Sequence, residues 1–225
     1  MATPLTDAIN ALTAYANETT GASDTTLSDA VESLVAGYGG GGGEWTTDGI
    51  AKNEEPKGDI VIGNVYRIQP YAFLRKKNIT SVKCLNPVIV MDCAFQACSA
   101  LTKIIIPNGY SGGGGTYQEN RLLEIADLNG QRIGANDFVY ANVMTKLILR
   151  HTGGVSNLVN VSAFTQTPFR GWNSQTGTLY VPSALVESYK TANNWKTLYD
   201  AGTMTILPIE GSIYETQYAD GTPIT

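Results

Sequence analysis

The stretch VMDCAFQACSALTKIIIP, residues 90–107, is the most complete copy of a pattern that the chain repeats. The stretch IQPYAFLRKKNITSVKCLN, which begins at Ile68, agrees with it when Ile68 is set beneath Val90. In each copy an Ala-Phe pair is followed, six residues after the phenylalanine, by Ile79 or Leu101 and then by an alternating apolar run. Such alternation is typical of a half-buried strand, so each copy predicts a turn and a strand.

Two further copies follow. The third begins at Ile133 and keeps Phe138, with Asp137 in place of the alanine, and a looser fourth starts at Ala163-Phe164 and ends in the strand GTLYVP. Each unit is too small to bury its own apolar face, but stacked units share a continuous core. We therefore expect the α+β class: a short leucine-rich-repeat-like solenoid of about four irregular repeats, with strands on one face and an N-terminal helical hairpin in front.

The pattern Ile-x-x-x-Ala-Phe-x-x-Cys-x-x-Leu-x-x-Ile-x-Ile-Pro resembles the BspA-like, or Treponema-type, leucine-rich repeat. The resemblance covers residues 60–209, although Lys76 and Ala141 stand where the family has its cysteine. The segment LYVPSALVESYKTANNWKTLYDAGTMTILPI is similar to the end of such domains, which implies a strand, a helix and a last strand. We expect Tyr189 and Trp195 in this segment to belong to the core.

Residues 1–38 predict a helical hairpin, and residues 39–59 a glycine-rich linker that leads into the repeats. Two short helices bury little by themselves, so their apolar faces are expected to meet a partner chain; the alternative is that they fold back on their own domain. The segment is similar to helical segments of phage and prophage tail and structural proteins of Gram-positive bacteria. The candidate assembly residues recur at helical spacing: Leu5, Ile9, Leu12, Leu27, Val31 and Leu34.

The three cysteines, Cys84, Cys93 and Cys98, raise the question of a metal or redox site. The repeat register places Cys84 and Cys98 at inward positions, where free cysteine packs as a small apolar residue. The only histidine, His151, follows a predicted strand, and no nucleophile motif accompanies it. We predict a protein that is not an enzyme and needs neither a cofactor nor a metal.

Two segments interrupt the repeats, and insertions in solenoids often form the binding face. The first, residues 108–132, contains the run SGGGGTY, interpreted as a flexible insertion, and Asn129-Gly130, which favours a tight hairpin turn. The second, residues 168–177, predicts an exposed aromatic loop suited to a glycan, unless Trp172 packs on the next repeat. The candidate binding residues are Phe169, Arg170, Trp172 and Asn173.

The composition of the chain limits the classes of partner that we expect it to bind. The net charge of −5, from 15 basic and 20 acidic residues, argues against nucleic acid. No apolar run approaches the roughly 18 residues that span a bilayer, which argues against membrane insertion. The N-terminus has no basic region, so it predicts an amphipathic helix rather than a secretory signal. Residues 210–225 are expected to form a C-terminal tail.

These features together predict a phage or prophage virion structural protein, a component of the tail, baseplate, fibre or decoration, located at the particle surface. Its N-terminal helices would bind virion structural proteins, its repeat-domain loops would bind a host surface protein or glycan, and it would form a homo-oligomer. The alternative is a bacterial cell-surface or secreted leucine-rich-repeat protein that serves adhesion or protein binding.

Overall fold

The computed structural model describes residues 13–14, 56–63, 65–111 and 113–224. The predicted helical hairpin, apart from Thr13 and Ala14, lies outside these residues, as does nearly all of the predicted linker. The same holds for the six candidate assembly residues, so their role stays a prediction.

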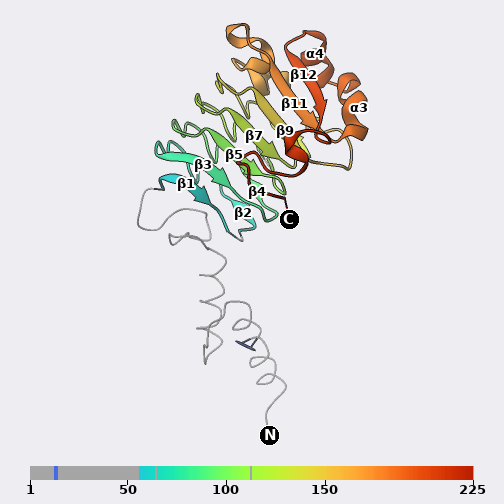
Figure 1. Cartoon of the computed structure of the whole chain (residues 1–225). Coiled ribbons are helices and arrows are strands. Elements are labelled where there is room, and N and C mark those ends of the chain that lie inside the picture. Colours follow the sequence, from blue (N-terminus) through green and yellow to red (C-terminus); the bar gives the residue numbers. More distant parts are fainter. Residues whose placement is uncertain (1–12, 15–55, 64, 112, 225) are drawn as a thin grey trace.

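The described chain winds into a β-solenoid of about four turns with little helix (Figure 1). One side of the solenoid is a seven-stranded sheet in which every neighbouring pair is parallel. Its strands, in spatial order, are β1 (Gly58–Val61), β3 (Ile79–Lys83), β5 (Lys103–Ile106), β7 (Ile125–Leu128), β9 (Lys146–Leu149), β11 (Gly177–Val181) and β12 (Met204–Pro208).

Two small parallel sheets form a second side of the solenoid. The first joins β2 (Arg67–Ile68), β4 (Ile89–Val90) and β6 (Tyr110–Ser111). The second joins β8 (Arg132–Ile133) and β10 (Asn157–Leu158). The expectation of stacked repeats is confirmed, and small strands lie at a second corner of every turn before β11.

The strand register shows the length of each turn directly. Ser81 pairs with Lys103 and Lys103 with Ile125, so these two turns are equally long. Ile125 pairs with Lys146, which closes a slightly shorter turn, whereas Lys146 pairs with Thr178 and closes a much longer one. The extra residues of this last turn include residues 168–177, where the sequence predicts an insertion.

A column of stacked aromatic rings fills the core. The ring centroids lie 4.8 Å apart from Phe73 to Phe95, 6.1 Å from Phe95 to Tyr117 and 5.4 Å from Tyr117 to Phe138. Phe164 continues the column, 5.6 Å beyond Phe138. Tyr117 belongs to the segment 108–132, so the prediction of an insertion there was wrong. That segment is a regular turn in which tyrosine takes the place of phenylalanine.

Neighbouring turns pack closely at two glycines in this region. The prediction of a flexible loop is therefore corrected to a closely packed turn. A Cβ atom on Gly113 would overlap the Asp92 carboxylate, and one on Gly134 would overlap the Gly113 carbonyl oxygen. Neighbouring turns therefore approach too closely for any side chain at either position. Asn129 and Gly130 form a corner between β7 and β8 rather than a hairpin, because β7 pairs only with β5 and β9.

The turns with the Ala-Phe pairs are held by hydrogen bonds between successive turns. The backbone N–H of Phe73 donates to the Ala94 carbonyl at 2.8 Å, and that of Phe95 donates to Thr116 at 2.9 Å. Amide groups used in this way are not free to build a helix, so the described residues form a β-solenoid with little helix; the N-terminal helices of the predicted α+β class lie outside them. The described helices are α3 (Val186–Thr191), α4 (Trp195–Asp200) and the 3₁₀ turns Val161–Phe164, Pro168–Arg170, Trp172–Ser174, Ser183–Leu185 and Ile213–Glu215.

Helices α3 and α4 close the C-terminal end of the solenoid before β12 completes the sheet (Figure 1). Tyr189 and Trp195 are fully buried, as expected. The Trp195 indole N–H donates to the Ser156 carbonyl at 2.8 Å, and the Tyr189 hydroxyl lies 2.6 Å from the Ser156 hydroxyl. None of the described helices is long and apolar enough to cross a membrane.

Candidate functional site

The outer face of the large sheet, which points away from the aromatic column, has a small core of its own. The register places Lys83, Ile105, Asp127, Ile148 and Tyr180 in one row across this face. Ile105, Asp127 and Ile148 are at most 1% exposed. The second core cluster contains Ile125, Ile148, Ile209 and Tyr214, with Tyr180 and Ala219 packed against it.

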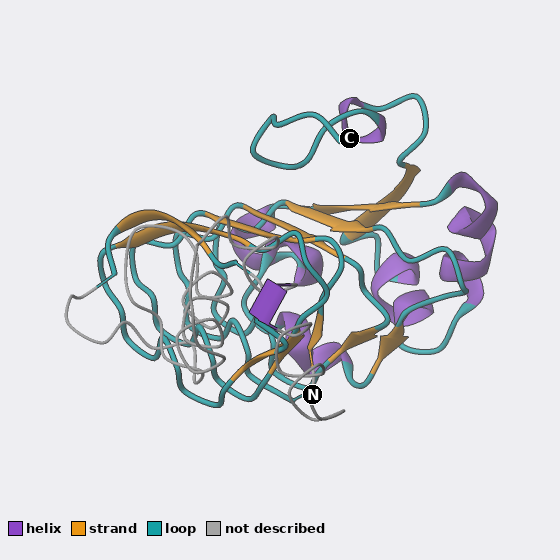
Figure 2. Cartoon of the chain, turned by 90° about the horizontal axis from the view of Figure 1, so that it is seen from below, coloured by secondary structure: helices purple, strands orange, loops and turns teal. Residues whose placement is uncertain are grey.

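The C-terminal segment, residues 209–224, provides the cover for this face. Figure 2 shows it on the side of the sheet opposite the turns of the solenoid. It leaves β12 with a hydrogen bond from the Ile209 N–H to the Val181 carbonyl at 2.8 Å. The Tyr214 ring then meets the Tyr180 ring edge-on, with 4.8 Å between their centroids. From there the segment runs back over the middle strands toward β3.

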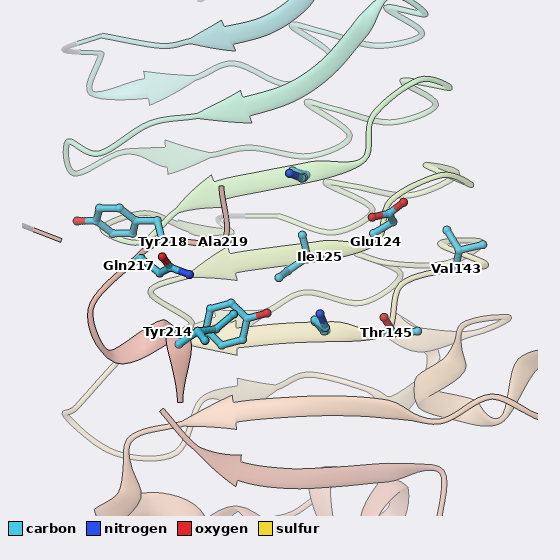
Figure 3. Close-up of a pocket in the computed structure, with 11 residues that line it drawn as sticks. Glu124, Ile125, Val143, Thr145, Tyr214, Gln217, Tyr218 and Ala219 are labelled. Atoms are coloured by element: carbon cyan, nitrogen blue, oxygen red, sulfur yellow. The ribbon is translucent and has the colours of Figure 1, made fainter. Parts of the chain in front are cut away.

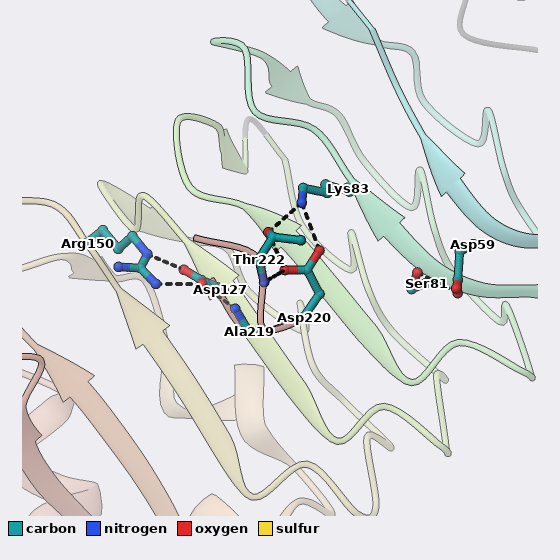
Figure 4. A network of polar contacts seen from close by, with 8 residues as sticks. All are labelled: Asp59, Ser81, Lys83, Asp127, Arg150, Ala219, Asp220 and Thr222. Atoms are coloured by element: carbon teal, nitrogen blue, oxygen red, sulfur yellow. Dashed lines mark hydrogen bonds and ion pairs between the residues drawn. The ribbon is translucent and has the colours of Figure 1, made fainter. Parts of the chain in front are cut away.

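An ion pair on the sheet anchors the middle of the segment (Figure 4). Arg150 binds Asp127 with two hydrogen bonds, Nε to Oδ1 at 2.6 Å and Nη2 to Oδ2 at 2.8 Å. The same guanidinium donates to the carbonyls of Tyr214 at 2.9 Å and Gln217 at 3.1 Å. The Ala219 N–H donates to Asp127 Oδ2 at 3.0 Å. The pair therefore satisfies three backbone groups of the segment.

Asp127 has no exposed side-chain surface. Burial raises the pKa of its carboxyl group above the ordinary value, while the hydrogen bonds and the charge of Arg150 oppose that rise. A buried charge of this kind is tolerated only with a partner in good geometry. The two-pronged contact with Arg150 has that geometry.

A second ion pair holds the end of the segment. Lys83 Nζ donates to Asp220 Oδ2 at 2.9 Å and to the Thr222 hydroxyl at 2.6 Å. The Tyr218 ring lies between two cations, with Lys83 Nζ at 5.7 Å and the Arg150 guanidinium at 5.3 Å from its centroid. Contacts of a cation with an aromatic ring at this distance are attractive. Both anchors thus converge on Tyr218.

The attachment of the segment is expected to weaken in acid. Burial raises the pKa of Asp220, but hydrogen bonds from Lys83 and Thr222 outweigh it and hold the pKa below the ordinary 3.8. A carboxyl whose pKa is lower in the docked state stabilises docking above about pH 3.8 and loses that contribution as the pH falls further. The released fraction should rise by up to about fivefold, because a pair at the surface contributes about 0.2 to 1 kcal/mol.

Hydrogen exchange of residues 210–224 between pH 5 and pH 3 would measure this change, after correction for the intrinsic exchange rate. Asp220→Asn is the matched control, because it keeps the shape and cannot titrate. Equal acid sensitivity of the wild type and Asp220→Asn would contradict the assignment to Asp220. Asp127, whose pKa is shifted the opposite way, would make the opposite contribution to docking in both proteins.

A cleft opens between the covering segment and strands β5, β7 and β9 (Figure 3). Its volume is about 470 Å³. Tyr214, Gln217 and Tyr218 stand on one side, and Glu124, Val143 and Thr145 stand on the opposite side. Its remaining lining residues are Lys103, Ile125, Lys146, Ile213 and Ala219.

The predicted aromatic loop is only partly available for binding. Phe169 is fully buried; its ring lies 5.1 Å from Phe164 and packs directly beneath Gly177. Its candidacy as a ligand contact was wrong, because the side chain fills the end of the aromatic column. Trp172 is half-buried, and Arg170 and Asn173 are exposed on adjacent 3₁₀ turns. The binding role of these three residues stays a prediction.

Cys84 and Cys98 are fully buried, which confirms the interpretation that they pack in the core. Burial raises the pKa of the Cys84 thiol to about 11 and that of Cys98 to about 12, so neither is a reactive thiolate near neutral pH. Cys93 is half-buried at a turn, with its sulfur 3.8 Å from the Gly114 carbonyl oxygen. Among the described residues, no three His, Cys, Asp or Glu side chains gather as a possible metal site.

Sequence reasoning missed the covered outer face, although a signal for it was present. All four residues of β7, IADL, are buried, and in β5 and β9 only the leading lysine is not. A strand that is apolar at consecutive positions is typically covered on both faces. The aspartate within β7 adds to this signal, because a charge in a buried strand needs a partner.

Comparisons of the chain with models of protein families, with curated proteins and with solved structures found no match.

Proposed function

We propose that this protein is a non-enzymatic binding protein whose solenoid is of the BspA-like leucine-rich-repeat type. The observation that supports the proposal best is the cleft on the outer sheet face. It is built from a rigid parallel sheet and a segment anchored by two ion pairs. A rigid scaffold with a preformed cleft binds a ligand at a low entropic cost.

The biological setting that we propose is a phage or prophage virion, in which the protein is a tail, baseplate, fibre or decoration component. Residues 1–38 would attach it to the particle, and the solenoid would contact a host surface protein or glycan. Oligomerisation would follow the symmetry of the attachment site. The support for this setting is the likeness of the N-terminal sequence to helical segments of phage structural proteins.

A bacterial cell-surface or secreted adhesion protein is the second candidate. The observation that favours it is the similarity of the repeat, best preserved in residues 90–107, to repeats found in surface adhesion modules. In that case the same cleft would face the environment from the surface of the producing cell.

Immunogold electron microscopy would test both settings together. Antibodies raised against the protein would be applied to particles released by lysis and to intact cells of the producing strain. We expect gold at a fixed position on the particles. Gold confined to intact cells would support the second candidate, and gold on neither sample would contradict the proposed function.

A further inference from the structure

We propose that the cleft between the C-terminal segment and strands β5 to β9 binds an acidic glycan, a saccharide chain with carboxylate or phosphodiester groups. This inference rests on the proposed function as a binding protein, and it replaces the loop at 168–177 as the principal ligand site. It follows from the charges, the polar groups and the walls of the cleft.

Two lysines supply the positive charge. Lys103 and Lys146 each pair in register with Ile125, so they lie on the same outer face and flank that residue. Strands in a sheet are about 4.8 Å apart, which places the two backbones about 10 Å from each other. Neither ammonium group takes part in an ion pair or side-chain hydrogen bond among the described residues, and Lys103 acts on Asp59 only through its charge. Both are therefore available to an anionic ligand.

The lining itself carries more positive than negative side chains, although Asp59, outside the lining, lies near enough to Lys103 to feel its charge. Glu124 is the single carboxylate in the lining. Arg150 is neutralised by Asp127, and Lys83 by Asp220. Within the lining, two lysines therefore face one carboxylate, in a protein whose net charge is −5. Positively charged groups in the cleft attract an anionic ligand and speed its approach.

The remaining lining suits a sugar better than a peptide or an isolated anion. The half-buried Tyr218 supplies aromatic surface, backed by Tyr214, which is only 4% exposed, and Gln217, Thr145 and Glu124 supply hydrogen-bonding groups. Sugars present both apolar ring faces and hydroxyl groups, so they need this mixture. A simple anion would make no use of the aromatic wall. The cleft is also partly open to solvent, so a saccharide unit can reach it from outside.

The C-terminal segment makes the site, because five of its residues line the cleft. Arg150 holds the carbonyls of Tyr214 and Gln217, and Asp127 holds the Ala219 N–H. These two residues are positioning residues that do not line the cleft themselves. A docked segment is therefore a condition for binding, and acid release of the segment should weaken it.

Affinity electrophoresis of the full-length protein tests the site with two matched pairs of polymers. Polygalacturonate is compared with methyl-esterified polygalacturonate, and phosphomannan with neutral mannan. We expect retardation by at least one acidic polymer and none by its neutral counterpart. The pair that responds identifies the anionic group as a carboxylate or a phosphodiester.

The variant that probes the lysines is Lys103→Gln/Lys146→Gln. Each lost charge-assisted hydrogen bond weakens binding by about tenfold, so the double variant should bind about a hundredfold more weakly if both lysines contact the ligand. The matched control is Lys57→Gln/Lys77→Gln, which removes the same charge from exposed positions outside the cleft. It should bind like the wild type. Circular dichroism melting of both variants shows that the fold is kept.

Three results would overturn the assignment. The first is the absence of retardation of the wild type by either acidic polymer, the second is an equal loss of binding in the two double variants, and the third is normal binding by Lys103→Gln/Lys146→Gln. Failure of this site and failure of the proposed function remain distinguishable. If immunogold still places the protein on particles or cells while the lysine variant binds normally, only the ligand site is wrong.

Discussion

Phe95→Ala is expected to lower the free energy of unfolding by about 3 to 5 kcal/mol, the range for emptying a packed aromatic site. Phe95 is fully buried in the aromatic column, with Phe73 stacked on one side at 4.8 Å and Tyr117 on the other at 6.1 Å. The alanine variant would leave a cavity that neighbouring turns cannot close, because backbone hydrogen bonds fix their spacing. Urea denaturation followed by circular dichroism would measure the loss.

Tyr66→Ala is the control for this prediction. Tyr66 is an aromatic residue of the same solenoid that is 73% exposed, so its loss should change stability by no more than about 0.5 kcal/mol. A loss below about 1 kcal/mol for Phe95→Ala would mean that the column is not the centre of the core. It would also remove the main support for the repeat register.

Asp127→Ala is the second change with a large expected effect, a loss of about 3 kcal/mol. It removes the acceptor of two Arg150 hydrogen bonds and of the Ala219 N–H. Arg150 is 15% exposed and can reach water, which places the cost at the lower end of the range for a broken buried pair. Release of the C-terminal segment limits the cost further, because it exposes Arg150 fully. Urea denaturation and limited proteolysis of residues 210–224 would report the two effects.

Two further variants test whether the effect of Asp127→Ala comes from the Asp127–Arg150 ion pair itself. Asp59→Ala removes an exposed aspartate on the same sheet, which accepts hydrogen bonds from Thr80 and Ser81, and should cost about 0.5 to 1 kcal/mol. The double change Asp127→Leu/Arg150→Met removes both charges at once and should recover part of the loss. A protease-resistant segment in Asp127→Ala would show that the ion pair does not anchor it.

The solenoid could be predicted from the sequence because its core is built from a periodic set of side chains. Ala72-Phe73, Ala94-Phe95 and Ala163-Phe164 all lie in turns, as their spacing predicted. The turn at 108–132 was missed because Thr116-Tyr117 replaces Ala-Phe and a glycine run precedes it. Leu123 nevertheless stands six residues after Tyr117, as the pattern requires. Comparison of side-chain size, rather than identity, would have found this copy.

The candidate site was harder to predict because its parts are far apart in the sequence and follow no period. Phe169 and Trp172 looked like one exposed loop, yet a glycine at position 177 gives the Phe169 ring a place in the core. The lysines of the cleft can be read from the sequence, but a single lysine at the start of a strand is common and does not indicate a binding site. Only the position of the C-terminal segment makes them two parts of one site.

The sequence by itself determined the period, the stacking of the turns and the inward placement of the aromatic rings and of Cys84 and Cys98. These features depend on side chains whose spacing matches the geometry of one turn, so each copy indicates the same structure. The tertiary structure alone decided what covers the outer face. Arg150 recognises the carbonyls of Tyr214 and Gln217, groups that every residue has, so no side-chain pattern could mark them as its partners.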